Sequence, residues 1–312
     1  MATELGTSVS LDESYAQCVA LTKERARNFH FAFSVLPPER YRGICALYAF
    51  SRIADDLSDD EAAPQKALAG AEAWRKAFDR ALAGDCAAPT AASEDEASRA
   101  VPYEILPAVA DTMLRCRIPP LYMHELIAGT EMDACQKRYE KWEDTYRYCY
   151  RVASVIGIMT IHVFGFNDPR AIPLAEKTGI AFQMTNILRD LAEDAGRGRI
   201  YLPLEDLRAH GVSEEELLAA KDSPAIRRLV EFEAQRAKEY YAAAPALLPL
   251  IAAESRDALG SLVAIYRRLL EEIERRDYDV LSSRVTLSTA EKLRLAAGFA
   301  WRKLLKPPTS GE

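Results

Sequence analysis

Two acidic stretches of the chain place carboxylates at helical spacing. In the first, residues 44–61 (ICALYAFSRIADDLSDDE), Asp55 and Asp59 lie four residues apart, and Arg52 and Tyr48 precede them. On an α-helix these four side chains occupy one narrow stripe, because each residue advances the helix by about 100°. The stretch therefore predicts a helix that presents one tyrosine, one arginine and two carboxylates on a single face.

The second stretch repeats this arrangement. Gln183, Asn186, Asp190 and Asp194 have offsets of zero, three, seven and eleven, which again define one stripe of a helix. An amide pair followed by a carboxylate pair is a set of oxygen donors without histidine or cysteine.

Like charges four residues apart repel each other, so two such stripes facing a cavity need a compensating cation. Oxygen donors suit hard ions, and Mg²⁺ is favoured over Ca²⁺, with Mn²⁺ as an alternative. Two facing stripes would hold a diphosphate between metal ions, which stabilise the charge on departing pyrophosphate. The alternative is that both clusters are solvated acidic faces. Asp56 and Asp60 have the same spacing as Asp55 and Asp59, so spacing alone leaves the register open.

The rest of the chain predicts helices to carry these stripes. Capping-box spacing occurs at Ser10, Ser213 and Ser288, and no run alternates with the period of a strand. We therefore expect an all-α fold, with about ten helices in a single bundle-like domain that spans residues 1–312. Residues 83–102 are small, polar and acidic and predict a surface loop, and residues 306–312 predict a frayed tail.

An apolar run from Val152 to Phe166 predicts a central buried helix, because it falls short of the ~20 residues that span a membrane. Continued from Tyr148, an α-helix would align Val152, Val155 and Met159 behind the tyrosine hydroxyl. Such a stripe suits a prenyl chain, and it equally suits ordinary core packing.

Composition excludes several classes of protein. A net charge of −7 and a pI of about 5.4 argue against a nucleic-acid partner. Six scattered cysteines without a CxxC pair suit reduced thiols in the cytoplasm. We expect a cytoplasmic protein with at most peripheral membrane contact, and the oligomeric state is left open.

Longer motifs resemble those of a known family. YAFSRIADDLSDD and AFQMTNILRDLAEDAGRGRIYLP look like the two aspartate-rich signatures of the squalene/phytoene synthase family. The similarity extends to NFHFAFSVLPPERYRGICALYAF, DTYRYCYRVASVIG and YDVLSSRV, so it spans nearly the whole chain. The resemblance implies an isoprenoid-synthase type helical bundle with a central cavity. It also implies head-to-head condensation of two prenyl diphosphates, farnesyl or geranylgeranyl, through a cyclopropyl diphosphate.

The resemblance also assigns roles to residues. It makes Asp55, Asp59, Asp190 and Asp194 metal ligands with Asn186, and its spacing from Arg52 favours Asp55 and Asp59 as the first pair. It makes Tyr148 the tyrosine that assists ionisation or proton removal, and Arg52 a diphosphate-binding arginine. The remaining positions that it places at the substrate are Phe29, Tyr48, Gln183, Asn186, Arg189, Tyr266 and Arg284.

One segment departs from the family pattern. Many members carry an SxSF segment before the first aspartate-rich helix, where this chain has Ala26-Arg27-Asn28-Phe29. The serine hydroxyls of that segment are therefore replaced in this chain, and the Asn28 amide is able to donate to a phosphate oxygen. The segment Gly196-Arg197-Gly198-Arg199 predicts either a mobile flap over the phosphates or a helix C-terminus, and we favour the flap.

Two other interpretations are kept. A head-to-tail prenyltransferase or class I terpene cyclase also uses aspartate-rich helices, usually as DDxxD, whereas this chain has DxxxD twice. A non-catalytic helical assembly factor of the same fold is the other. Within the leading interpretation, the likeness around YDVLSSRV and RYCYRVAS favours the presqualene diphosphate and squalene type over the phytoene type. No GxGxxG fingerprint occurs, so use of NADPH is left open.

Overall fold

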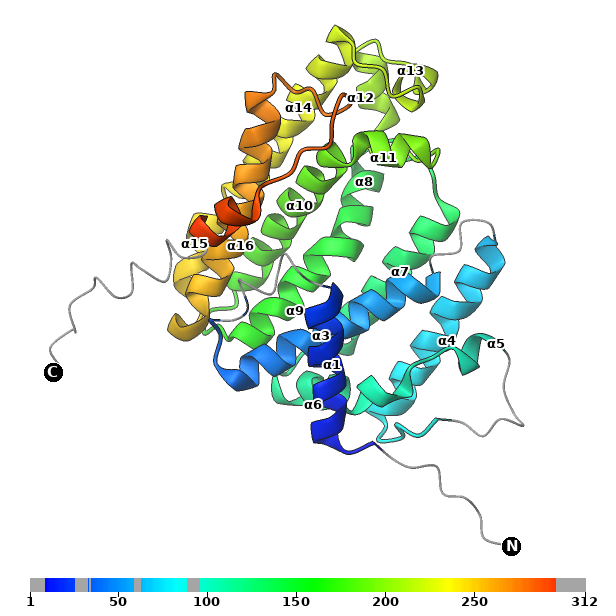
Figure 1. The fold of residues 1–312 in the computed structure, drawn as a ribbon, viewed down its shortest axis with the longest axis vertical. Helices are drawn as coiled ribbons and strands as arrows, with labels where there is room; N and C mark the ends of the chain where they lie inside the picture. Colours follow the sequence, from blue (N-terminus) through cyan, green and yellow to red (C-terminus); the bar gives the residue numbers. More distant parts are fainter. Residues whose placement is uncertain (1–8, 26–32, 34, 59–62, 89–95, 296–312) are drawn as a thin grey trace, which may run out of the picture. The chain divides into compact units, whose positions relative to one another are not determined.

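The computed structural model describes residues 9–25, 33, 35–58, 63–88 and 96–295 of the 312-residue chain. Its helices follow one another in the order α1 (Leu11–Arg25), α3 (Pro38–Ser58), α4 (Pro64–Leu82), α5 (Glu96–Arg99), η1 (Tyr103–Ile105), α6 (Leu106–Arg115), α7 (Pro120–Cys135), α8 (Trp142–Cys149), η2 (Tyr150–Ser154), α9 (Val155–Phe164), α10 (Ala171–Arg189), α11 (Leu191–Gly196), α12 (Leu204–Ala209), α13 (Glu214–Leu218), α14 (Pro224–Tyr241), α15 (Ala244–Leu247), η3 (Leu248–Leu250) and α16 (Ala253–Arg275) (Figure 1). Within the described ranges the only β-type pairing is an isolated bridge between Phe166 and Ile251. The all-α prediction is confirmed.

Sequence signals for helix starts are largely confirmed. Ser213 and Glu216 form a capping box at α13, and Ser223 caps α14 ahead of Pro224. Ser10 pairs in the same way with Glu13 before α1. After Ser288, whose hydroxyl accepts from the Glu291 amide, residues 289–295 are helical.

Contacts group the chain into two compact units, each built from three segments. Unit 1 comprises Met1–Arg27, Pro38–Gln136 and Val155–Val163, and unit 2 comprises Asn28–Pro37, Lys137–Ser154 and Phe164–Glu312. The prediction of a single domain around a central cavity concerns the arrangement of the two units and stays a prediction.

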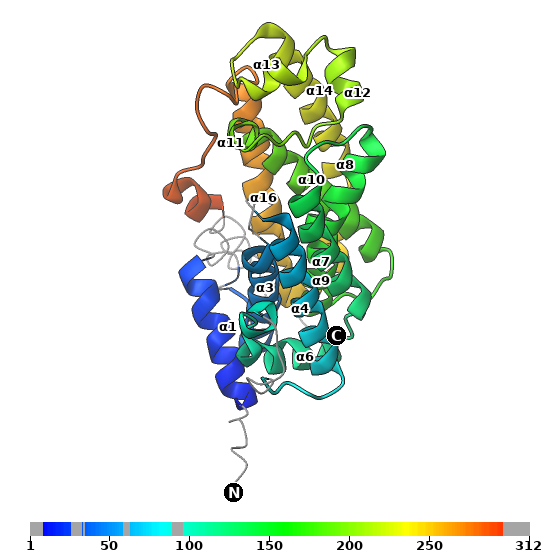
Figure 2. The same cartoon turned by 90° about the vertical axis from the view of Figure 1, so that its right-hand side faces the viewer.

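Unit 1 is built around α3, which packs against α1, α4, α6 and α7 (Figure 2). Phe50 of α3 meets Trp74 and Phe78 of α4 with ring centroids 4.8 and 5.2 Å apart, and all three side chains are fully buried. Gly70 brings α4 against the last turn of α3, because a Cβ there would lie 2.3 Å from the Leu57 carbonyl oxygen. Aromatic packing and one close crossing thus fix the turn that carries Asp55.

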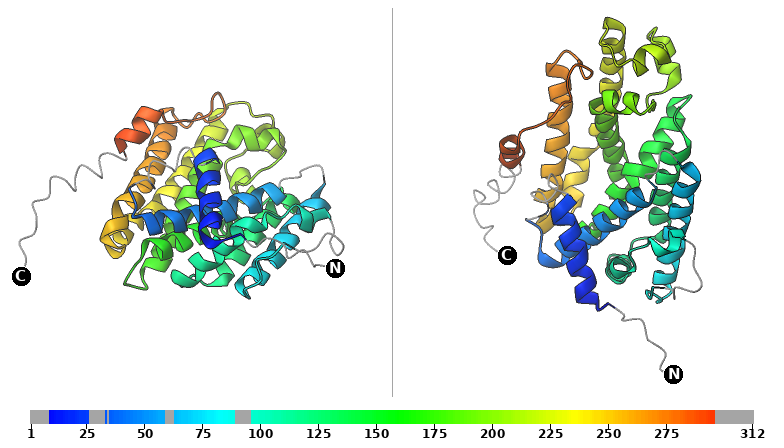
Figure 3. Two further views of the ribbon diagram at one scale, coloured as in Figure 1. Left: turned by 60° about the horizontal axis from the view of Figure 1, so that its bottom comes forward. Right: turned by 45° about the vertical axis from the view of Figure 1, so that its right-hand side comes forward.

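Unit 2 is built around α10, which packs against α14, α15, α16 and η2 (Figure 3). Gly179 permits the contact with η2, since a Cβ there would lie 2.5 Å from Ser154 Cα. The hydroxyl of Thr185 on α10 is 2.9 Å from that of Tyr241 on α14, in the buried interior. The first part of the second acidic stripe, Gln183 and Asn186, therefore lies on a helix that other elements of unit 2 pack against.

The chain from α8 to α9 is not one α-helix. Residues Tyr150–Ser154 form the π-helix η2, whose hydrogen bonds join residues five apart. Because the wider turn changes the angular step, Tyr148, Val152, Val155 and Met159 do not form the single stripe that α-helical spacing predicted. Burial of the run is confirmed at Val155 and Met159.

The described part of residues 83–102 is mostly exposed, as expected, but it includes the short helix α5 and the buried Val101. The predicted tail, residues 306–312, lies outside the described residues. No helix in the described part is long and apolar enough to cross a membrane. All six cysteines are free thiols.

Candidate active site

The first acidic stripe lies at the C-terminal end of α3, in unit 1. Tyr48 and Arg52 are partly buried and Asp55 is exposed. The Arg52 guanidinium donates to Asp56, one turn further along the helix. Asp59, Asp60 and Phe29 lie outside the described residues, so the choice between Asp55/Asp59 and Asp56/Asp60 stays a prediction.

Charge dominates the environment of Arg52. Burial opposes its charge, but the hydrogen bond to Asp56 and the charges of Asp56 and Asp55 outweigh burial and raise its pKa. The buried Nε atom of Arg52 has no hydrogen-bond partner among the residues that the structure describes. A guanidinium with one donor unused suits an additional anionic oxygen.

The second acidic stripe lies at the C-terminal end of α10, in unit 2, and its predicted neighbours come together. Asp190 is held between two guanidinium groups, those of Arg189 and Arg284. Arg189 donates to both of its carboxylate oxygens, from Nε over 2.9 Å to Oδ1. Arg284, from the segment after α16, donates from Nε over 2.9 Å to the same Oδ1 and lies 3.4 Å from Glu193.

Two amides and a tyrosine adjoin this ion pair. Asn186 Nδ2 donates to Gln183 Oε1 over 3.2 Å, whereas its buried Oδ1 accepts from no described residue. Tyr266 of α16 stacks on Phe182 with centroids 4.2 Å apart. Burial raises the pKa of Tyr266, and the charge of Arg189 and a hydrogen bond with Asn186 oppose it.

Asp194 follows on α11, after a junction at Asp190. Helical hydrogen bonds cross this junction, from the Asp190 amide to Asn186 O and from the Asp194 amide to Asp190 O, both over 2.9 Å. Burial, followed by the charges of Asp190 and Glu193, raises the pKa of Asp194 to about 7. The ionised form of the Asp194 carboxylate is thus unfavourable unless a cation binds beside it.

The donors at this end of α10 fit a hard metal ion. Asp190 and Asp194 supply carboxylates, and the orphaned Oδ1 of Asn186 supplies a neutral oxygen. Within the described ranges no group of three or more His, Cys, Asp and Glu side chains is placed to hold a metal. Mg²⁺ usually binds proteins through one or two carboxylates and completes its shell with water and substrate oxygens.

Tyr148, the predicted catalytic tyrosine, lies in an aromatic cluster of unit 2. Its ring stacks on Tyr201 with centroids 4.7 Å apart and meets Tyr139 at 5.3 Å. The Tyr201 hydroxyl in turn accepts from Arg199 Nη1 over 3.2 Å. The buried rings of Tyr139 and Tyr201 therefore fix the plane of the Tyr148 ring.

Comparison with known proteins connects these features to a family. The sequence model described as squalene/phytoene synthase matches residues 22–291. The chain belongs to the squalene/phytoene synthase family. Members of this family are prenyltransferase-type enzymes that condense prenyl diphosphates head to head.

Individual relatives cover almost the whole chain. It is 32% identical to a 15-cis-phytoene synthase of Synechococcus elongatus over 96% of this chain and 93% of the relative. It is 31% identical to phytoene synthase 1, chloroplastic, of Arabidopsis thaliana over 98% of this chain and 70% of the relative.

Solved structures give the same family and the isoprenoid-synthase fold. A dehydrosqualene synthase in complex with a ligand matches with a TM-score of 0.80 and 27% identity, over 94% of this chain and 98% of that one. Squalene synthase HpnC from Alicyclobacillus acidocaldarius matches with a TM-score of 0.75 and 26% identity, over 87% and 98%.

Sequence reasoning missed several residues that this family member places beside the predicted ones. Arg199 and Tyr201 lie inside the second signature, so their support of Tyr148 was within reach of the motif. Lys292 was not, because it lies in no periodic stripe. Burial, and then the charge of Arg189, lowers the pKa of Lys292. A third cation therefore stands near the two arginines, Arg189 and Arg284, that pair with Asp190.

Of the two alternatives for residues 196–199, the structure shows the helix C-terminus, and the flap that we favoured stays a prediction. Gly198, with φ of 70°, ends α11 in a Schellman motif, in which its amide donates to Ala195 O and the Arg199 amide to Asp194 O. Arg138 Nη1 also donates to Gly198 O over 2.6 Å. The glycine and its neighbours serve as a helix C-terminus, which closes the helix of Asp194.

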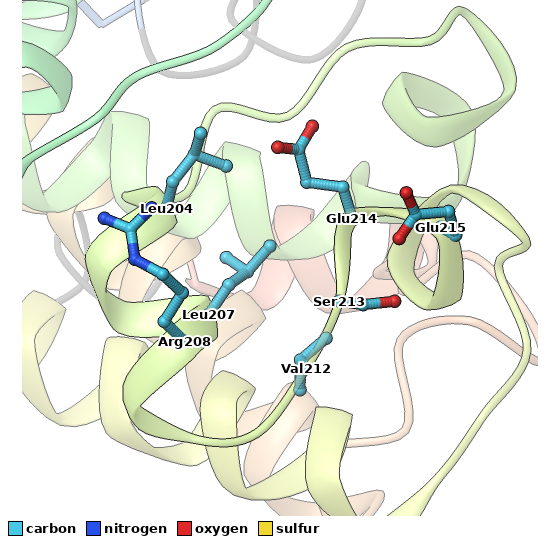
Figure 4. Close-up of a pocket in the computed structure, with 7 residues that line it drawn as sticks. All are labelled: Leu204, Leu207, Arg208, Val212, Ser213, Glu214 and Glu215. Carbon is cyan, nitrogen blue, oxygen red and sulfur yellow. The ribbon is translucent and has the colours of Figure 1, made fainter.

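Two hollows elsewhere in unit 2 are separate from the predicted site residues. One of about 210 Å³ lies between α12 and α13, where Arg208 and Glu214 stand on opposite sides of Leu204 and Leu207 (Figure 4). The other, of about 340 Å³, is lined by α15, α16 and Leu295. Neither includes a residue of the second acidic stripe.

Proposed function

We propose that the chain joins two allylic prenyl diphosphates head to head, forms a cyclopropyl diphosphate and releases pyrophosphate. The observation that carries the proposal is the clamp of Arg189 and Arg284 on Asp190, with Asn186 and Asp194 beside it. Cations, carboxylates and an orphaned amide oxygen at one helix end suit a diphosphate and its counter-ions.

The acidic residues would hold Mg²⁺, or Mn²⁺ in its place. Asp190, Asp194 and Asn186 are the proposed ligands in unit 2, and Asp55 and Asp59 those in unit 1. When bound, the metal would act as a Lewis acid that stabilises the charge on departing pyrophosphate.

The arginines bind and orient the diphosphate. Arg189 and Arg284 offer forked, charge-assisted hydrogen bonds, and Arg52 offers its unused Nε donor. Because both unit 2 arginines are paired with Asp190, substrate oxygens compete with that carboxylate for the same donors.

Tyr148 carries the proton-transfer role in this proposal. Its hydroxyl is placed by a buried aromatic stack, so it meets the allylic cation with little loss of entropy. The enclosed rings also keep water away from a cation that water would quench.

Two observations bear on the product class, and they favour different products. The motifs YDVLSSRV and RYCYRVAS, and structural likeness to dehydrosqualene and squalene synthases, favour the presqualene diphosphate and squalene type. The curated relatives named above are phytoene synthases, which favours the longer geranylgeranyl substrate. We place the enzyme in the cytoplasm, with at most peripheral membrane contact.

The first experiment measures pyrophosphate release by Asp190→Asn and Asp55→Asn. Both variants should lose turnover by about a hundredfold or more, because each removes a charge that holds the metal ions and diphosphate, while circular dichroism keeps its helical signal. Asp168→Asn, just before the other end of α10, is the matched control. Near-normal turnover in both site variants would overturn the site assignment.

The second experiment is mass spectrometry of products formed from farnesyl or geranylgeranyl diphosphate, with and without NADPH. A cyclopropyl diphosphate from one of them supports the proposal and gives the chain length. Cyclised products from farnesyl diphosphate alone would indicate a terpene cyclase. Failure to release pyrophosphate from either, with Mg²⁺ or Mn²⁺ present, would indicate a non-catalytic protein of this fold.

A further inference from the structure

A corner of unit 1 exposes apolar side chains that the fold does not use. The α6–α7 corner, residues 114–121 (LRCRIPPL), joins the end of α6 to the start of α7 (Figure 2). Leu114 is 72% exposed and Leu121 is 59% exposed, and the exposed Pro119 and Pro120 lie between them. Single exposed leucines are ordinary, but two on one short corner form a small apolar surface.

The corner also holds an arginine where a glycine would be favoured. α6 ends in a Schellman motif, in which the Arg117 amide donates to Leu114 O and the Ile118 amide donates to Met113 O. Arg117 occupies the left-handed position of this motif, with φ of 52°. Side chains strain the backbone there, so the chain accepts a cost to keep an arginine.

The Schellman motif itself needs neither Arg117 nor Leu114. Its usual apolar contact is made by Met113 and Ile118, both buried. Leu114 points away from that contact, as its exposure shows. The two side chains are therefore available to an outside partner.

The charge of the corner is positive, in a chain whose net charge is −7. The Arg117 side chain forms no ion pair or hydrogen bond with any of the described residues, while Arg115 is paired with Asp111 at 2.8 Å. Arg40 lies close enough to act with Arg115 on the neighbouring Cys116 thiol, whose pKa burial raises and the two cations lower. The cationic corner is thus a local exception on an acidic protein.

We propose that the α6–α7 corner docks on a bilayer that contains anionic phospholipid. Leu114 and Leu121 enter the boundary between headgroups and acyl chains, and Arg117 meets a lipid phosphate. A small apolar surface with a cation beside it is the combination that binds such an interface.

The experiment measures sedimentation of the full chain with vesicles of equal parts phosphatidylglycerol and phosphatidylcholine, and with vesicles of phosphatidylcholine alone. Binding should be stronger to the anionic vesicles and should weaken as salt is added. Arg117→Gly should reduce binding about fivefold, the worth of one basic residue at such a surface. Its melting temperature should stay equal to the parent's or rise, because glycine relieves the strained backbone.

The double variant Leu114→Ser/Leu121→Ser tests the apolar part, and Leu68→Ser on α4 removes an exposed leucine elsewhere in unit 1 as the control. Binding should fall about tenfold or more in the double variant and stay unchanged in the control. Equal binding by the parent, Arg117→Gly and the double variant would overturn the proposal. So would absence of binding to anionic vesicles at low salt, or a corner whose variants change only the oligomeric state in size-exclusion chromatography.

Discussion

Tyr148 owes its position to residues far away in the chain. Tyr201 covers one face of its ring, and Tyr139 stacks on Tyr201 and borders Tyr148 as well, with centroids 5.7 and 5.3 Å away. Thr145, one turn before Tyr148, donates from its hydroxyl to Tyr201 O over 2.9 Å. Tyr201, which follows the second acidic stripe in the sequence, thus orients Tyr148, the residue proposed to move the proton.

We expect Tyr201→Leu to lower kcat about tenfold or more with a smaller change in KM, because Tyr148 loses its stacking partner while the diphosphate site is intact. Tyr201→Phe keeps the ring and should restore most of the activity. Steady-state kinetics with pyrophosphate detection measures both. Equal activity of the leucine and phenylalanine variants would show that the stack does not position Tyr148.

Glu233 is the most deeply buried acid of unit 2. Its Oε2 accepts from Arg236 Nη1 over 2.7 Å, and the same Nη1 donates to Asp206 over 2.8 Å. Burial raises the pKa of Glu233 to about 8, against the charge of Arg236 and with the support of Asp206. The raised pKa favours the protonated form of Glu233 in the folded protein near neutral pH.

This protonation makes stability depend on pH. The folded protein keeps the proton up to about pH 8, whereas the unfolded chain releases it near the ordinary value of 4.5, so the free energy of unfolding falls as pH rises between them. Glu233→Gln should remove this dependence and melt at a higher temperature than the parent at pH 8. Thermal melts from pH 4.5 to 8 measure it, with the exposed Glu231→Gln as control. A parent and Glu233→Gln variant that change in parallel would contradict the assignment.

At the scale of elements, the crossing of α10 and η2 supports the second acidic stripe. Ser154 Oγ donates to Glu176 O over 2.8 Å beside the contact that Gly179 permits. The crossing at Gly179 fixes α10 about two turns before Asn186 and about three turns before Asp190. Its packing therefore bears on the geometry of the diphosphate site.

Gly179→Ala should destabilise the protein by about 1–3 kcal/mol, because a methyl group there overlaps the backbone of η2. Gly196→Ala, at the end of α11, has open space and should be neutral or stabilising by about 0.4–1 kcal/mol. Urea unfolding followed by circular dichroism compares the two. Equal midpoints would mean that α10 and η2 move apart to accept the methyl group with no loss of unfolding free energy.

Sequence spacing predicted what lies on one helix and missed what depends on another. The helix that carries Gln183 and Asn186 and ends at Asp190 was predictable because α-helical periodicity is local, whereas Asp194 lies on the next helix, α11. The π-helix η2, which packs against Gly179, was not predicted, since no proline or glycine lies within it to mark a departure from the α-helix. Regular helices follow from the sequence, and departures from them follow from tertiary contacts.

The same distinction holds in the site. Arg284 reaches Asp190 across 94 residues, and only the family resemblance, not spacing, assigned it to the substrate. Lys292 had neither a motif nor a period to mark it. Asp59 and Phe29 lie outside the described residues, so their predicted roles stay predictions.

At the scale of the whole molecule, the chain passes repeatedly between its two units. Unit 1 takes its last segment, Val155–Val163, from between two segments of unit 2. Neither unit is a continuous piece of chain, so the unfolding of one unit pulls on the chain segments of the other. We therefore expect one cooperative unfolding transition for both.

Buried cysteines provide a probe in each unit. Cys45 lies in unit 1 and Cys149 in unit 2, both fully buried, whereas Cys135 is exposed. With rising urea, alkylation read by mass spectrometry should give Cys45 and Cys149 the same midpoint, while Cys135 reacts throughout. Midpoints that differ clearly would show that the units unfold independently.

The π-helix η2 ends at Ser154, and the segment of unit 1 begins at the next residue. One residue more or fewer here would turn everything downstream by about 100°, and Val155 and Met159 would leave the core. The number of residues between Tyr148 and α9 therefore determines which side chains of α9 face the core. Natural variation in this stretch should exchange side chains freely while the number of residues stays constant.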